Sequence, residues 1–185
     1  MKNGIAKTLL FTFLVLFFLF VILQSHFYIF RATPEITKSQ QREIVQLAAE
    51  ALKTSDVPVG ALLLYDDDII GKGFNTVNKD RNVAGHAEIN AINDAVQTMG
   101  MEKFKRLNRD KLILVSSFEP CEMCKGTMLH YNIKKVYFMK DKSLLHWIKN
   151  GYKSFRYEWK KKKIEGAQLQ DSLFMLHPDY PGKKD

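Results

Sequence analysis

Four side chains have the types and spacing needed for a catalytic metal site. His86 and Glu88 lie in a His-Ala-Glu triplet, and Cys121 and Cys124 lie in a Pro-Cys-x-x-Cys segment further along the chain. Two cysteines three positions apart at the start of a helix project their thiols to the same side, where the positive end of the helix favours metal-binding thiolates. One histidine and two cysteines form a known catalytic zinc set that leaves a fourth position open for water. We therefore expect Zn²⁺ to be held by His86, Cys121 and Cys124.

Glu88 gives this site a use beyond binding metal. It follows His86 by two positions, so its carboxylate can lie beside the open position without being a ligand. A zinc-bound water has a pKa near neutrality, and a neighbouring carboxylate can carry its proton to a leaving nitrogen. Either half of the pattern is weak alone, because a Cys-x-x-Cys pair also occurs in redox and structural sites. Both halves in this order are the signature of zinc deaminases, with the glutamate as general acid and base.

The spacing of apolar residues indicates the elements that must position these groups. Thr37 and Ser39 offer N-caps to a helix that ends near Lys53. Two β-rich runs between residues 59 and 74 are separated by three aspartates, which predicts a hairpin.

Two further helices and two strands follow, and they place the candidate ligands. The pattern predicts helices over 85–99 and 121–131, and strands over 112–117 and 134–139. The resulting β-β-α-β-α-β order implies an α/β fold with a mixed sheet covered by helices. His86 and Cys121 then each begin a helix, so that two helix N-termini can meet at one ion.

From about residue 40 to 140 the chain resembles the cytidine-deaminase-like superfamily, and within it the bacterial tRNA adenosine deaminases and guanine deaminases. Four segments carry this resemblance: Val57–Ala61, Gly73–Asn75, His86–Glu88 and Glu119–Cys124. The resemblance implies a three-layer α/β/α fold, a Zn²⁺ cofactor and a homodimer. It also implies hydrolytic release of ammonia from a nucleobase or nucleoside.

The same resemblance implies a role for each residue of the site. His86, Cys121 and Cys124 would bind zinc, and Glu88 would move the proton. Asn75 would hydrogen-bond the edge of the base. The backbone of three small residues would line the pocket: Gly60, Ala61 and Ala87.

Departures from the family pattern leave the substrate open. Ala84 and Gly85 replace the Thr-Ala pair that is usual before the histidine, and Lys125 replaces a small or apolar residue after the second cysteine. The residues after about 141 match neither the tRNA enzymes nor the guanine enzymes. We expect a guanine-type purine as substrate, with adenosine in tRNA, converted to inosine, as the alternative. A catalytically idle zinc module that binds nucleic acid at a membrane is the alternative from another class, and the retained Glu88 argues against it.

An apolar block near the N-terminus predicts a membrane anchor. Residues 8–30 carry no charge, and about 20 apolar residues span the hydrocarbon layer as a helix. A cleaved signal peptide and a buried core helix are the alternatives, but no small-x-small cleavage site precedes Arg31 and the block lacks a polar face. We expect a single-pass membrane protein with its deaminase domain in the cytoplasm, where reducing conditions keep the two cysteines as thiols.

The expected domain organisation has four parts: an anchor with a short tail over 1–31, a linker over 32–38, the deaminase domain over 39–165 and a C-terminal extension over 166–185. The net charge is +8, which is compatible with a phosphate-bearing partner or an anionic surface. Basic and aromatic residues alternate over 149–163. They could grip phosphates and stack on bases, lie on an anionic membrane, or form a solvated face whose aromatics complete the core.

Overall fold

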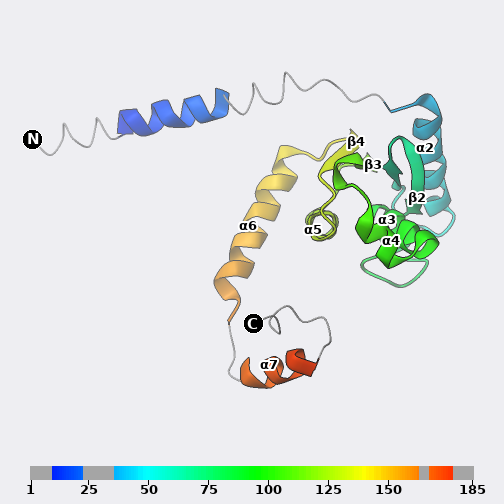
Figure 1. The fold of residues 1–185 in the computed structure, drawn as a ribbon. Helices are drawn as coiled ribbons and strands as arrows, with labels where there is room; N and C mark the ends of the chain where they lie inside the picture. Colours follow the sequence, from blue (N-terminus) through cyan, green and yellow to red (C-terminus); the bar gives the residue numbers. More distant parts are fainter. Residues whose placement is uncertain (1–9, 23–35, 163–166, 177–185) are drawn as a thin grey trace, which may run out of the picture. The chain divides into compact units, whose positions relative to one another are not determined.

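The computed structural model describes residues 10–22, 36–162 and 167–176. The chain divides into two compact units, residues 1–139 and 140–185 (Figure 1). The expected domain boundaries stay predictions, and residues 32–35 of the expected linker lie outside the described residues.

Helix α2 (Lys38–Leu52) opens the folded part of the first unit. Thr37 is its N-cap: the Thr37 hydroxyl accepts from the Gln40 N–H at 3.1 Å, and Gln40 Oε1 accepts from the Thr37 N–H at 2.9 Å. This capping box fixes where the helix begins, at the end of the expected linker. The inward face of the helix is apolar and buried at Ile44 and Ala48, and it therefore packs on the sheet.

Strands β1 (Gly60–Tyr65) and β2 (Asp68–Phe74) form the predicted antiparallel hairpin. Asp66 and Asp67 turn the chain with φ angles of 49° and 70°. Two positive φ angles in succession make the kind of tight turn whose twist matches that of the flanking strands. The turn sets the register, which places the end of β2 beside the start of β1.

The four strands of the sheet lie in the order β2-β1-β3-β4. Strand β3 (Leu112–Phe118) pairs antiparallel with β1. The chain passes from β3 to β4 (Lys135–Lys140) through helix α5 (Glu122–His130), the kind of crossover that joins parallel strands. The predicted mixed sheet is therefore confirmed.

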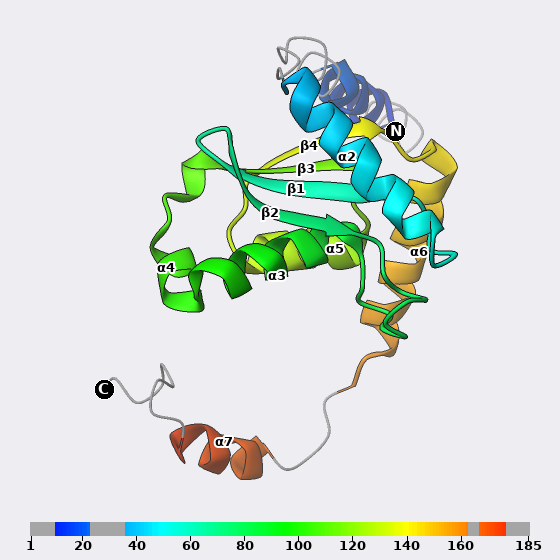
Figure 2. The same cartoon turned by 90° about the vertical axis from the view of Figure 1, so that its right-hand side faces the viewer.

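Helices cover both faces of this sheet (Figure 2). Helix α2 packs on one face around a buried apolar cluster: Ile44, Leu62, Leu64 and Val115. Helices α3 (Ala87–Met99) and α5 lie on the other face, over a larger cluster that includes Ala61, Leu63, Ala91, Leu114 and Met128. The predicted three-layer α/β/α arrangement is confirmed.

Helix α3 lies directly against β2 because two glycines of the strand leave room for it. A Cβ atom on Gly71 would lie 2.1 Å from the carbonyl oxygen of Ala91, and one on Gly73 would lie 2.2 Å from that of Ala87. Any other residue at these positions would push the helix away from the sheet. Gly73 therefore sets how closely the first turn of α3 approaches the end of β2.

Helix α4 (Met101–Arg106) and a short 3-10 helix (Arg109–Lys111) connect α3 to β3. Gly100, with a φ of 84°, separates α3 from α4. Phe104 is fully buried and its ring meets the Tyr131 ring edge-on at 5.7 Å. This contact anchors the connection against the end of α5.

The second unit contains helices α6 (Leu144–Lys160) and α7 (Ala167–Leu176). Ser143 caps α6, since its hydroxyl accepts from the His146 N–H at 3.3 Å. The basic and aromatic stretch over 149–163 is helical as far as Lys160, and residue 163 lies outside the described residues. Large apolar side chains of α6 are exposed: Leu145, Ile148, Tyr152, Phe155 and Trp159.

The predicted transmembrane anchor is wrong. The structure describes residues 10–22 of the apolar block as helical. Within the described residues, no helix combines the length and the apolar character that crossing a membrane requires. The expected single-pass membrane localisation is corrected with it. Residues 8–9 and 23–30 of the apolar block lie outside the described residues.

Candidate metal centre and base-binding residues

His86 and Cys121 stand at the N-caps of α3 and α5, and neither side chain caps its own helix. They meet instead, with His86 Nδ1 3.6 Å from Cys121 Sγ. Cys124, in the first turn of α5, brings its Sγ to 3.5 Å from the same nitrogen and 3.6 Å from Cys121 Sγ. The two helix starts therefore converge on one point, as the sequence predicted.

The separations of these atoms fit a tetrahedral zinc ion. Bonds of about 2.3 Å to sulfur and about 2.0 Å to nitrogen place two sulfurs about 3.8 Å apart, and a sulfur and a nitrogen roughly 3.5 Å apart. The candidate ligand atoms of His86, Cys121 and Cys124 all lie within 4.8 Å of one another. One imidazole nitrogen and two thiolates are donors that zinc prefers. The group can therefore hold zinc and leave one coordination position for a further ligand.

Glu88 lies in the first turn of α3 and is buried, with 4% of its surface exposed. Its Oε1 accepts from the Ser116 hydroxyl on β3 at 3.2 Å, and its Oε2 accepts from the Cys124 thiol at 3.4 Å. The carboxylate thus reaches the edge of the ligand group. Sequence reasoning missed Ser116, for which the one available signal is a pair of serines that interrupts an apolar strand.

The two thiols hold their protons differently when no metal is bound. The contact with the Cys124 side chain and the N–H groups of Cys124 and Met123 lower the pKa of Cys121 to about 4, although partial burial opposes this. Cys124 keeps its proton, because its hydrogen bond to Cys121, its burial and the nearby Glu88 carboxylate raise its pKa. Cys121 is therefore a thiolate at neutral pH. Bound zinc would displace the proton of Cys124, since a coordinated thiol is deprotonated.

Asn75 directly follows β2 and is buried, with 7% of its surface exposed. Its backbone N–H donates to the carbonyl oxygen of Val59 at 3.0 Å. Its side-chain amide, oriented by the groups around it, donates to Gly85 O at 2.9 Å and accepts from the Val57 N–H at 3.3 Å. An amide has two donor hydrogens and two acceptor lone pairs, so one of each is left for a ligand.

The three small residues expected to line the pocket gather at one end of the β1–β2 hairpin. Ala61 pairs with Gly73 across the hairpin, and Gly73 lies against the carbonyl group of Ala87. Gly60 donates its N–H to the Ser117 hydroxyl at 3.1 Å. Their part in binding a base stays a prediction.

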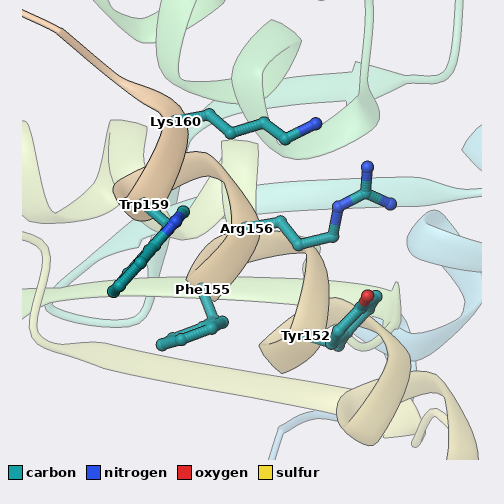
Figure 3. Close-up of a pocket in the computed structure, with 5 residues that line it drawn as sticks. All are labelled: Tyr152, Phe155, Arg156, Trp159 and Lys160. Carbon is teal, nitrogen blue, oxygen red and sulfur yellow. The ribbon is translucent and has the colours of Figure 1, made fainter.

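Helix α6 carries a second candidate surface, a hollow of about 220 Å³ lined by Tyr152, Phe155, Arg156, Trp159 and Lys160 (Figure 3). The Phe155 and Trp159 rings are stacked, with centres 6.2 Å apart and planes at 29°. The Arg156 guanidinium lies 5.8 Å from the centre of the Tyr152 ring. Aromatic faces beside cations suit ligands that combine flat rings with negative charge.

Residues 35–140 match the family model described as the cytidine and deoxycytidylate deaminase zinc-binding region. The matched region contains Asn75, Glu88 and all three candidate metal ligands. The family is zinc-binding, and this chain supplies a histidine and two cysteines whose geometry fits the metal.

Relatives of known name match the same part of the chain. It is 38% identical over 96 residues to tRNA-specific adenosine deaminase 2 of Xenopus tropicalis, which covers 50% of this chain and 55% of that protein. It is 33% identical over 105 residues to the tRNA-specific adenosine deaminase of Haemophilus influenzae, covering 56% of this chain and 58% of that protein. The chain thus spans about half the length of the curated relatives it matches.

Solved structures share the fold. A chain from a study of A-to-I editing by tRNA:A34 deaminases at the wobble position of transfer RNA aligns with a TM-score of 0.50 and 28% identity, over 55% of this chain and 75% of that one. Guanine deaminase from Bacillus subtilis aligns with a TM-score of 0.58 and 23% identity, over 78% of this chain and 97% of that one. At 23% identity the second likeness shows the fold alone.

Proposed function

The chain belongs to the cytidine and deoxycytidylate deaminase zinc-binding family, and from that premise we propose that it is a hydrolytic deaminase of an amine-bearing nucleobase. The observation that carries the proposal is the buried Glu88 carboxylate at the edge of the group formed by His86, Cys121 and Cys124. Bound zinc would supply an activated water as nucleophile. Glu88 can carry the two protons that the water loses, one to the ring nitrogen and one to the leaving amine, which departs as ammonia.

Other groups of the chain orient the two reaction partners. The Ser116 hydroxyl holds Oε1 of Glu88, which leaves Oε2 toward the proposed metal ligands. The remaining donor and lone pair of Asn75 complement the edge of a base, and a buried amide of this kind discriminates strongly when its pairing is lost. We therefore assign Asn75 to base orientation, with the backbone of Gly60, Ala61 and Ala87 lining the pocket.

A purely structural zinc site accounts for fewer of these features. Closed structural sites use four protein ligands, whereas the ligand group found among the described residues has three. Burying a carboxyl group is costly, and Glu88 is buried beside the ligand group without belonging to it. Both observations support catalysis over an idle zinc module.

Adenosine in tRNA is the substrate that we place first. The relatives named as tRNA-specific adenosine deaminases, at 38% and 33% identity, support this choice. Free guanine, which the sequence pattern favoured, is the second candidate. It is retained because the residues after about 141 match the C-terminal pattern of neither group of enzymes and so do not separate the two substrates.

The basic and aromatic surface of α6 supports RNA as a partner. Six cations lie on the helix or directly after it, against one acid at Glu158: Lys149, Lys153, Arg156, Lys160, Lys161 and Lys162. Phosphate contacts supply much of the affinity of proteins for nucleic acids, and exposed aromatic rings stack on unpaired bases. We infer that this surface binds a single-stranded part of the tRNA.

A second copy of the chain is the partner that we propose for strand β4. This strand ends the strand order of the sheet and exposes Phe138 and Met139 at 43% and 44%. An edge strand with exposed apolar side chains invites pairing with another chain. Light scattering should therefore report a homodimer, and Phe138→Lys should shift it toward monomer.

Ammonia release from a substrate panel tests the proposed function. The zinc-loaded full-length chain is incubated with guanine, adenosine, cytidine and an anticodon stem-loop that carries adenosine at the wobble position. We expect inosine in the stem-loop, and none with Glu88→Ala. Activity on guanine without activity on the stem-loop would select the second candidate. A zinc-loaded chain that releases ammonia from none of these substrates would contradict the proposal.

A further inference from the structure

Asn90 lies one turn after His86 on α3, and its backbone N–H donates to His86 O at 2.9 Å. Its side chain is half-buried and reaches back to the end of β2. The amide nitrogen lies 2.8 Å from Phe74 O, 3.0 Å from Thr76 Oγ1 and 3.4 Å from Gly85 O. One nitrogen therefore contacts two separate stretches of the loop that leads from β2 to His86.

The three acceptors flank the residues on which the proposed chemistry depends. Two of them belong to the chain neighbours of Asn75, and the third belongs to Gly85, which immediately precedes His86. Asn90 thus contacts the backbone just before the proposed base-contacting residue, the Thr76 hydroxyl just after it, and the backbone directly before the proposed metal ligand.

The two stretches of this loop are also joined to each other. The Thr76 N–H donates to Gly85 O at 2.7 Å, and the Asn75 side chain donates to the same oxygen at 2.9 Å. The two stretches are packed so closely that position 85 has no room for a side chain: a Cβ atom on Gly85 would lie 2.8 Å from Thr76 Oγ1. A displacement of one stretch therefore displaces the other.

The tip of the loop has a separate anchor. The buried Asp56 carboxylate accepts from the Asn78 N–H at 2.6 Å and from the Lys79 N–H at 3.1 Å. These bonds hold the tip but reach neither end of the loop. The bonds from Asn90 differ because they join the end after β2 to the end before α3.

We propose that Asn90 is a positioning residue that holds Asn75 and His86 in a fixed relation, and so sets where a bound base lies relative to the metal. Its catalytic consequence rests on the proposed function. Productive sites hold their groups to within about 0.5 Å, and a displacement of about 1 Å can cost on the order of 10²-fold in rate. Loss of the Asn90 amide should therefore slow turnover while the metal ligands themselves remain.

The test compares the full-length wild type with Asn90→Leu, which keeps a similar size but has no donor. Asn93→Leu, at an exposed position of the same helix, is the matched control. On the substrate that the wild type deaminates, Asn90→Leu should lower kcat/KM roughly 10- to 100-fold and raise KM, with bound zinc unchanged. Amide hydrogen exchange over residues 76–86 should become about ten-fold faster, because the loop opens more readily. Asn93→Leu should match the wild type in every measurement.

Thr76→Val keeps the test decisive if Asn90→Leu does not fold, since it removes one of the three acceptors with little change of shape. It should also speed exchange over residues 76–86. Unchanged exchange there in a folded variant overturns the proposal, and so does faster exchange with wild-type kinetic constants. A wild type that deaminates no substrate contradicts the proposed function instead, and the exchange comparison then still decides whether Asn90 holds the loop.

Discussion

The Ser116 hydroxyl and the Glu88 carboxylate meet in the buried interface between β3 and α3, with 3.2 Å between Oγ and Oε1. The two residues are 0% and 4% exposed. A hydrogen bond in such a low-dielectric interior is electrostatically stronger than the same bond in water. The pair therefore fixes which oxygen of Glu88 faces the proposed metal centre.

Replacing Ser116 with alanine should leave the carboxylate free to turn away from that position. We expect Ser116→Ala to lower turnover about 10- to 100-fold, the usual effect of losing a group that orients a metal-site residue. Bound zinc, measured by atomic absorption, should stay at the wild-type level. Ser39→Ala, at an exposed position of α2, is the control. Wild-type turnover by Ser116→Ala would show that the hydroxyl does not orient Glu88.

Glu88→Gln should separate metal binding from proton transfer. The amide keeps the shape of the carboxylate and can still pair with Ser116, but it cannot accept a proton at neutral pH. We expect turnover to fall about 10²- to 10⁴-fold, the range typical of a general acid or base. Zinc content should match that of the wild type. A variant that retains zinc and near-normal turnover would exclude Glu88 as the proton carrier.

Cys121→Ser should abolish zinc binding and lower the melting temperature, because metal-binding energy is partly folding energy. Chelation should lower the melting temperature of the wild type and leave that of the variant unchanged.

Zinc affinity should weaken as the pH falls, since binding displaces the proton of Cys124, whose pKa is raised. Titration with a competing chelator at several pH values measures this dependence. Equal affinity across the series would contradict proton release from Cys124.

Asp56 should make stability depend on acidity. Burial alone would raise its pKa, but hydrogen bonds from the N–H groups of Asn78 and Lys79 and from the Thr54 hydroxyl lower it. The Asp56 carboxyl then binds its proton more tightly in the unfolded chain than in the folded one. The charged carboxylate therefore stabilises the fold fully above the ordinary pKa of about 3.9. It is lost as the pH falls through the lower value of the folded state.

Melting temperatures measured from about pH 5 downward test this dependence. The wild type should lose stability below about pH 4 more steeply than Asp56→Asn, which has no proton to gain. Asp80→Asn, at an exposed position of the same loop, should retain the wild-type slope. If the melting temperatures of the wild type and Asp56→Asn fell in parallel with pH, the folded chain would not favour the charged form of Asp56.

The cations of α6 should give RNA binding a marked salt dependence. A chain with Lys149, Lys153 and Lys160 replaced by alanine should bind the anticodon stem-loop about ten-fold more weakly. Its log–log salt slope should fall by about 0.7 for each RNA phosphate that the chain no longer neutralises. Alanine at Lys103 and Lys105 of α4, two exposed cations elsewhere, is the matched control. An equal weakening in both variants would assign the effect to net charge alone.

Local sequence patterns were enough to predict the placement of His86 and Cys121 at helix starts, because helix N-termini and strand periodicity are properties of neighbouring residues. Ser116 and Asn90 escaped prediction for the opposite reason. Ser116 bonds Glu88 across 28 positions, and Asn90 bonds Phe74 across 16. Neither residue belongs to a spacing pattern that would reveal such partners.

The N-terminal block failed for a different physical reason. The prediction of a membrane anchor rested on the number of apolar residues in the block, whereas crossing a membrane requires that they form one helix of sufficient length. Among the residues that the structure describes, no helix combines that length with the apolar character.

The close approach of Gly73 to the carbonyl group of Ala87 has a consequence for thermal motion. Exposed side chains exchange rotamers within picoseconds to nanoseconds, and packing that depends on them moves with them. Where backbone packs directly on backbone, no side chain can change rotamer between them. The distance between the first turn of α3 and β2 therefore stays constant through these fluctuations. His86 and Glu88 both belong to this rigid region. The residues proposed for the chemistry therefore keep their distance from β2 while the side chains around them fluctuate.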